Sequence, residues 1–235
     1  MAMQICTGDG CEPVRQLRAK LDDLTKKLTK YGDRLLRETA LRKKAEDAAM
    51  RDSVTGAFNR RGLEYKFGEE LSRQRRSRKI FCIIFVDVDD FGAFNKRYGE
   101  HTGDNVLRGL VEAVRGCLRG YDSVCRIGGD EFVVLLPESQ SLVNACTVAE
   151  RIRRRIEAAE VMSQDGKALH ISISIGVAAL DGTEDLQELI DRANSAEMAA
   201  KNAGKGAVFV FVDGKAQEAG IYLEGLRACR DASAT

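Results

Sequence analysis

Residues Ile80–Asp87 read IFCIIFVD, a continuous apolar run that ends in an acidic residue. An apolar run without alternation is typical of a strand that is buried on both faces in the middle of a sheet. Farther along the chain, Ser123–Arg126 and Phe132–Leu136 are two strand-like segments on either side of a Gly-Gly pair, which indicates a β-hairpin. The sequence therefore predicts a buried central strand and an adjacent hairpin.

The segments around this strand and hairpin alternate between helical and strand patterns. Helices are predicted over Asp104–Leu118, Leu142–Ala159 and Asp185–Asn202, and strands over His170–Ala178 and Ala207–Val212. This order predicts an α/β (α+β) sandwich over residues 52–235, with a central, mostly antiparallel sheet that is flanked by helices.

Residues 13–51 have the apolar spacing of one long helix. Apolar residues recur at a 3-4 spacing for about three heptads, at positions Val14, Leu17, Leu21, Leu24, Leu28, Tyr31 and Leu35. This repeat predicts a parallel coiled coil with a second copy of the chain, and hence a homodimer. After Leu35 the apolar stripe continues in a new register, as a stutter produces. The alternative is that the helix packs back on its own domain.

The composition limits the partners and the compartment of the chain. Its net charge is +1 over 235 residues, which gives no reason to expect a nucleic-acid or membrane partner. No apolar run approaches the length of a membrane span. Seven cysteines without metal-ligand spacing, and no secretory leader, favour the reducing cytoplasm. Residues 1–12 are predicted to be a polar tail, in which Cys6 and Cys11 could bind a metal, form a disulfide or be disordered.

Four acidic residues are predicted to lie at one end of the sheet. Asp87 ends the central strand, Asp89 follows two residues later, and Asp130 and Glu131 follow the Gly-Gly pair at the tip of the hairpin. Converging carboxylates repel each other unless a hard cation lies between them. Mg²⁺ combines one or two carboxylates with water and substrate phosphates, and pairs of such ions serve nucleotidyl transfer. The alternative is an ordinary acidic turn on the protein surface.

Arg126–Phe132 reads RIGGDEF, which resembles the signature of the GGDEF family of diguanylate cyclases. Four other segments resemble motifs of the same family, in the family's order around this signature: Asp52–Arg61 (DSVTGAFNRR), Val86–Leu107 (VDVDDFGAFNKRYGEHTGDNVL), Ser174–Ala178 (SIGVA) and Ala193–Gly204 (ANSAEMAAKNAG). The likeness covers the chain from Asp52 to about residue 212. It implies the nucleotidyl-cyclase, palm-like form of this fold and an enzyme that condenses two GTP molecules into cyclic di-GMP and two pyrophosphates.

The resemblance implies that the acids form a catalytic metal site. The metal ligands would be Asp87, the backbone carbonyl of Val88, Asp130 and Glu131, and they would hold two Mg²⁺ or Mn²⁺ ions per active site. Asp130 would also accept the proton of the 3′-hydroxyl. One domain would bind one GTP, so two domains would have to face each other, and the homodimer would be part of catalysis.

The resemblance also implies which residues bind the substrate. Asn95 and Asp104 would hydrogen-bond guanine, because a carboxylate accepts from the ring N–H and the exocyclic amine, a pair of donors that adenine lacks. Lys201 and Lys205 would contact phosphate, and the backbone of Gly128–Gly129 would lie against the nucleotide. The alternatives are a helix-surface amide for Asn95 and a helix N-cap for Asp104.

A second motif implies control by the product. Arg119–Asp122 (RGYD) resembles the RxxD inhibitory site of the family, in which Arg119 and Asp122 would bind cyclic di-GMP away from the catalytic site. Arg151, within Ala149–Arg153 (AERIR), resembles a second arginine that a neighbouring domain supplies. The alternative for this four-residue pattern is a surface ion pair.

The chain departs from the family pattern at several positions. The family often has Lys at the position of Gly92 and Asp at the position of Lys96. Its usual Gly-His pair is Gly99-Glu100 here, and its usual Gly-Arg-Asn is Gly204-Lys205-Gly206. These differences imply weaker substrate binding or a lower rate. They leave the metal-binding acids intact, so the chain is expected to be active.

Three other functions agree with parts of the sequence. A domain that kept the RGYD motif and lost turnover would be a receptor for cyclic di-GMP. An enzyme with a different product would make a mixed GMP–AMP ring, although Asp104 argues for guanine. A purely structural dimerisation protein would not need Asp87 at all.

Overall fold

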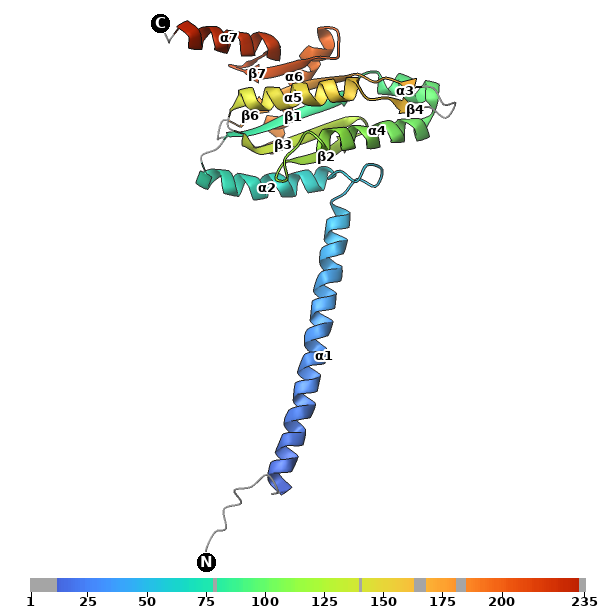
Figure 1. Cartoon of the computed structure of the whole chain (residues 1–235), viewed down its shortest axis with the longest axis vertical. Helices are drawn as coiled ribbons and strands as arrows, with labels where there is room; N and C mark the ends of the chain where they lie inside the picture. The colour runs from blue at the N-terminus through green and yellow to red at the C-terminus, as the bar shows by residue number, and fades with distance from the viewer. Residues whose placement is uncertain (1–11, 78–79, 140, 163–167, 181–184, 233–235) are drawn as a thin grey trace, which may run out of the picture. The chain divides into compact units, whose positions relative to one another are not determined.

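A computed structural model describes residues 12–77, 80–139, 141–162, 168–180 and 185–232 of the chain (Figure 1). The chain divides into two units, Met1–Ala49 and Met50–Thr235. The predicted polar tail, with Cys6 and Cys11, lies outside the described residues except for Glu12. Among the described helices, none is both long and apolar enough to cross a lipid bilayer.

The described part of the first unit is a single helix, α1 (Glu12–Ala49), of 38 residues. It confirms the long helix predicted over residues 13–51. No residue of α1 is buried, and Leu17, Leu24 and Leu28 of the apolar repeat are 73%, 56% and 70% exposed. An apolar stripe this exposed suits a second helix as its partner. The coiled coil itself stays a prediction.

The second unit is built on a six-stranded sheet with the strand order β2-β3-β1-β6-β7-β8. These strands are β1 (Ile80–Val88), β2 (Ser123–Gly128), β3 (Glu131–Ser139), β6 (Ile173–Ala179), β7 (Val208–Val212) and β8 (Lys215–Glu218). Neighbouring strands are antiparallel, except that β6 and β7 are parallel. A separate two-stranded sheet pairs β4 (Val161–Met162) with β5 (Ala168–Leu169). The mostly antiparallel sheet is therefore confirmed.

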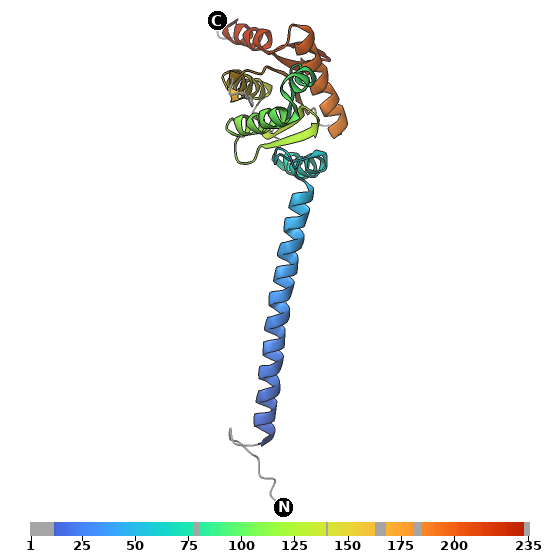
Figure 2. The same ribbon diagram turned by 90° about the vertical axis from the view of Figure 1, so that its right-hand side faces the viewer.

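Helices lie against both faces of the large sheet (Figures 1 and 2). The described helices of this unit are α2 (Arg60–Ser77), α3 (Phe91–Tyr98), α4 (Glu100–Arg115), α5 (Leu142–Glu157), α6 (Leu186–Asn202) and α7 (Ala219–Ala232). Successive side chains of β1 point to opposite faces, so Ile84 joins a core with α4 and α5, while Ile83 and Phe85 join a core with α2 and α6. Residues 81–88 of β1 are all buried, as its apolar run predicts. The predicted sandwich is confirmed.

Several predicted boundaries are wrong, and two of them are the starts of elements. The helix predicted over Asp104–Leu118 is α4, which begins at Glu100 after Gly99, whose φ of 83° suits only glycine. Asp104 lies inside this helix, so its interpretation as an N-cap is wrong. The strand predicted over His170–Ala178 begins only at Ile173.

The prediction missed several elements, of which α2 is the longest. Its apolar residues Leu63, Phe67 and Leu71 recur only once per turn in a charged sequence that also contains Gly62 and Gly68. Such a narrow stripe is weak as a helix signal in the sequence alone. It suffices here because Leu63 and Phe67 are buried against the sheet.

Candidate active site

The register of the central strands brings the predicted acids to one end of the sheet. Asp87 of β1 lies directly opposite Glu131 of β3, a position in which Cβ atoms are about 4.5–5.5 Å apart. Asp130 precedes Glu131 in the turn between β2 and β3, and the side chain of Asp87 is influenced by the charges of both. Three of the four predicted acids, Asp87, Asp130 and Glu131, therefore lie together at this end of the sheet, and their role as metal ligands stays a prediction.

A lysine from α6 lies among these acids. Lys201 Nζ is 2.8 Å from Asp87 Oδ1 and 3.0 Å from Glu197 Oε1. Burial raises the pKa of Asp87 and the negative charges of Asp130 and Glu131 raise it further, while Lys201 lowers it. For Lys201, burial lowers the pKa, but the hydrogen bonds to Asp87 and Glu197 outweigh burial and raise it. The two buried carboxylates thus keep this lysine charged.

Glu197 is a site residue that sequence reasoning missed. It is only 1% exposed, and burial raises its pKa although Lys201 opposes the change. A buried glutamate needs a partner, and its position four residues before Lys201 on one helix is the signal that could have revealed the pair.

The donor set has the chemistry that a hard divalent cation requires. The charges of Asp130 and Glu131 raise the pKa of Asp87, and a cation with oxygen ligands relieves this kind of repulsion between carboxylates. In the part of the chain that the structure describes, no three His, Cys, Asp or Glu side chains are arranged so that they could hold a metal ion. The ammonium of Lys201 instead supplies the positive charge beside Asp87.

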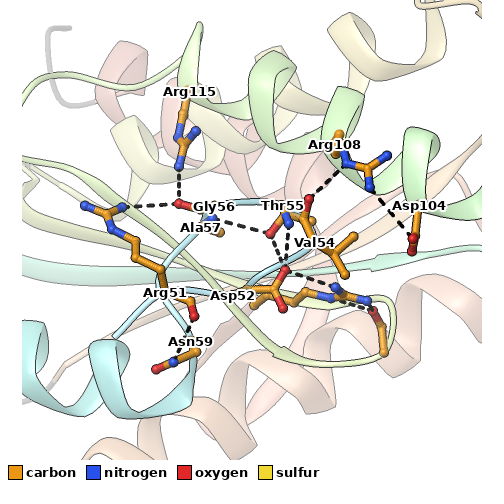
Figure 3. Close-up of polar contacts among 12 residues, drawn as sticks. Arg51, Asp52, Val54, Thr55, Gly56, Ala57, Asn59, Asp104, Arg108 and Arg115 are labelled. Carbon is orange, nitrogen blue, oxygen red and sulfur yellow. Dashed lines mark hydrogen bonds and ion pairs between the residues drawn. The ribbon is translucent and has the colours of Figure 1, made fainter. Parts of the chain in front are cut away.

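The hairpin tip is tied to the turn that begins the second unit (Figure 3). Arg126 donates to Gly129 O at 2.9 and 2.7 Å and to Asp52 Oδ1 at 3.0 Å. Asp52 also accepts from Thr55 N at 2.9 Å and from Thr55 Oγ1 at 2.6 Å. Burial alone would raise the pKa of Asp52, but the bonds from Thr55 and Arg126 outweigh it and lower the pKa. The motif at Asp52 thus fixes the backbone next to Asp130.

Arg108 connects the same turn to the predicted guanine-binding residue Asp104 (Figure 3). Arg108 Nε donates to Val54 O at 3.0 Å, and its Nη2 lies 3.8 Å from Asp104 Oδ2. The side chain of Asp104 is 39% exposed, so it is available to a ligand.

Asn95 and Asp104 come from neighbouring helices and lie close together. A Cβ atom added at Gly103 would be 1.9 Å from Asn95 Oδ1, so the amide of Asn95 lies directly on the residue before Asp104. Asn95 Oδ1 is buried and has no hydrogen-bond partner among the described residues. The amide oxygen of Asn95 is therefore buried, although the residue as a whole is partly exposed.

The remaining predicted substrate-binding residues lie in two parts of the fold: Gly128 and Gly129 are at the hairpin turn, and Lys205 follows α6. Gly128 lies under Glu131, whose Oε2 would be 2.7 Å from an added Cβ, so a larger residue would displace that carboxylate. Gly129 is exposed and holds Arg126 through its carbonyl. Lys205 pairs with Asp90, not with the carboxylates around Lys201.

The predicted inhibitory residues line a cavity of about 210 Å³ that α5 and β3 also line. Asp122 Oδ2 accepts from Arg119 N at 2.8 Å, and burial raises the pKa of Asp122 although Arg119 and Arg151 lower it. Arg151 lines the same cavity and donates to Cys117 O. Arg151 thus lies in the same cavity as Arg119 and Asp122 of its own domain, and the contribution of an arginine by a neighbouring domain stays a prediction.

Comparison with known proteins agrees with this geometry. The family described as "Diguanylate cyclase, GGDEF domain" matches residues 49–207. Diguanylate cyclase DosC of Escherichia coli (strain K12) is 36% identical over 157 residues, which are 67% of this chain and 34% of DosC. The response regulator PleD of Caulobacter vibrioides (strain NA1000 / CB15N) is 34% identical over 164 residues, 69% of this chain and 36% of PleD. The chain thus spans about a third of the length of these curated relatives.

A solved structure of a diguanylate cyclase is also similar to this chain. The diguanylate cyclase SiaD from Pseudomonas aeruginosa, solved in complex with its activator SiaC, is similar with a TM-score of 0.71 at 30% identity. The similarity covers 84% of this chain and 76% of that chain. Together with the family match, these relatives show that the chain belongs to the GGDEF-domain family of diguanylate cyclases.

Proposed function

We propose that this chain is a diguanylate cyclase, which condenses two GTP molecules into cyclic di-GMP and two pyrophosphates. The observation that carries the proposal is the strand register that sets Asp87 opposite Glu131, next to Asp130 in the signature turn. DosC and SiaD are both described as diguanylate cyclases, and the similarity to them supports the proposal. A cytoplasmic location follows because GTP is the substrate, and cell fractionation would test it.

Metal ions are part of this proposal. Asp87, the carbonyl of Val88, Asp130 and Glu131 would hold two Mg²⁺ or Mn²⁺ ions per active site, since hard cations prefer oxygen ligands. When bound, such ions neutralise charge on the triphosphate and on the leaving pyrophosphate. Lys201, which otherwise neutralises Asp87, can then turn to a phosphate.

The residues of the chain bind and orient the nucleotide. Asn95 and Asp104 would hold guanine, and Lys201 and Lys205 would bind phosphate. Asp130 would accept the proton of the 3′-hydroxyl, whose oxygen forms a bond to the α-phosphorus of the GTP on the facing domain while pyrophosphate leaves. The reciprocal step closes the ring, so two domains complete one product.

Incubation of the full chain with GTP and Mg²⁺, followed by chromatography of the products, tests this activity. We expect cyclic di-GMP and two pyrophosphates for each ring. A chain that binds added cyclic di-GMP tightly and forms no product would be a receptor, and the cyclase proposal would be wrong. Competition with ATP tests the product, because a mixed GMP–AMP ring would contradict the guanine-binding role of Asp104.

We propose that the exposed apolar stripe of α1 pairs two chains and so raises the effective concentration of the two half-sites. Specific activity is therefore expected to rise with chain concentration until all chains are paired. Light scattering at the same concentrations should show the mass of a dimer. Constant specific activity of a monomeric chain over the whole dilution series would contradict the proposal.

We propose that the cavity lined by Arg119, Asp122 and Arg151 binds the product and inhibits the enzyme. Loss of a hydrogen bond from a charged group costs about 1.5–3 kcal/mol. Arg119→Ala is therefore expected to raise the cyclic di-GMP concentration for half-inhibition about tenfold to a hundredfold. Arg154→Ala, which removes an exposed arginine outside this cavity, is the control. Equal inhibition of the Arg119 variant and the parent chain would show that the product binds elsewhere.

A further inference from the structure

A surface ion pair beside the candidate site holds a lysine that we assign to phosphate binding. Lys205 Nζ donates to both carboxylate oxygens of Asp90, at 2.7 and 2.8 Å. Asp90 lies between β1 and α3, and Lys205 follows α6, so 115 residues separate the two along the sequence. The contact joins two loops at the end of the sheet that carries Asp87.

A second carboxylate and the backbone hold these loops in place. Asp89 accepts from Gly206 N at 3.1 Å and from Ser174 Oγ at 2.7 Å. Asp90 and Lys205 both have a left-handed backbone, with φ of 56° and 67°. This conformation is unfavourable for most residues other than Gly, Asn and Asp. A lysine that adopts it indicates that the surrounding contacts fix the backbone of the loop.

In this ion pair, the carboxylate of Asp90 neutralises the positive charge of Lys205 that the phosphates of the substrate would need. Lys205 and Lys201 are the two lysines that the proposed function assigns to phosphate binding. We propose that Asp90 sets the affinity of the site for the triphosphate, because its carboxylate competes with the nucleotide phosphates for Lys205. This inference rests on the proposed function. Nucleotide binding replaces Asp90 by a phosphate as the partner of Lys205.

The exposure of this ion pair to solvent limits how strongly Asp90 competes with the nucleotide phosphates for Lys205. The side chains of Lys205 and Asp90 are 41% and 68% exposed, and solvent screens an ion pair of this kind. Loss of the competing carboxylate is therefore expected to strengthen phosphate binding about two- to fivefold. The contact is strong enough to change KM and weak enough for a phosphate to displace it.

Asp90→Asn in the full chain tests the inference. Asparagine tolerates the left-handed backbone, so the variant is expected to fold. We expect the KM for GTP to fall about two- to fivefold while kcat is unchanged. The matched control is Asp213→Asn, which removes another exposed aspartate with a left-handed φ, 51°, from the turn at the far end of β7. This control should leave KM unchanged.

A double variant separates competition for Lys205 from a general effect of charge. In the Lys205→Ala background, Asp90→Asn has no ammonium to release, so its gain in affinity should disappear. A gain that persists in this background would overturn the proposal, because the carboxylate would then act by repulsion alone. A KM that rises in Asp90→Asn would also overturn it, because Asp90 would then position Lys205 for the substrate.

Calorimetry with inorganic tripolyphosphate distinguishes a failure of this inference from a failure of the proposed function. The probe contains the phosphates without the base and requires no turnover. Tighter tripolyphosphate binding by Asp90→Asn supports the competition even if the parent chain makes no cyclic di-GMP. Equal or weaker binding overturns the competition even if the parent chain is an active cyclase.

Discussion

Glu131→Gln is expected to lower the rate of cyclic di-GMP formation by at least about a hundredfold, to the level expected when one preorganised charge is lost from an active site. Glutamine has nearly the same shape but carries no negative charge, so the change removes a metal ligand and little else. Glu131 lies opposite Asp87 at the end of the sheet, where the proposed metal ions would be bound. The rate should be measured as pyrophosphate release at saturating GTP and Mg²⁺.

A substitution of Glu131 tests the proposed metal site better than a substitution of Asp87 does. Asp87 pairs with Lys201 and is buried, so its replacement would leave a partly buried ammonium with less compensation and would disturb stability as well as chemistry. Glu112→Gln, on the exposed surface of α4, is the matched control, since it makes the same chemical change away from the site. Full activity of Glu131→Gln would show that this carboxylate is not needed and that the acids do not form the proposed metal site.

The sequence predicted the centre of the fold well because the centre depends on local patterns. The apolar run of β1 requires burial on both faces, and the Gly-Gly pair requires a turn, so the strand and the hairpin could be placed without their partners. The start of α4 could not be placed in the same way. It begins at Glu100, directly after a glycine with positive φ, whereas Asp104 is a better N-cap by residue type and lies inside the helix.

The candidate site was predictable only to the extent that its residues carry a motif. Asp87, Asp130 and Glu131 lie in recognisable segments, and the register brings them to one end of the sheet. The partners that hold the site come from distant parts of the chain: 74 residues separate Arg126 from Asp52, and Lys205 lies 115 residues from Asp90. Charged residues at such separations show no spacing rule, so only the folded chain reveals which of them pair.

Gly176→Ala is expected to destabilise the second unit by about 3 kcal/mol, at the upper end of the usual cost of overpacking a core. Gly176 lies in β6, under α6. An added Cβ would be 1.9 Å from Ala193 O and 2.4 Å from Glu197 N, which are backbone atoms and cannot rotate away. The helix would have to move off the sheet. Thermal unfolding should show a Tm lower by roughly 6–12 °C, given about 2–4 °C per kcal/mol for a domain of this size.

Gly109→Ala provides the matched control for this prediction. Gly109 lies within α4, and an added Cβ would meet nothing within 4 Å, so the same methyl group should leave the Tm unchanged or raise it slightly. The displacement in Gly176→Ala should also weaken GTP binding, because α6 carries both Glu197 and Lys201. If Gly176→Ala unfolds at the temperature of the parent chain, α6 moves away from the sheet at little cost. The close approach of α6 to β6 would then not be what holds Lys201 beside Asp87.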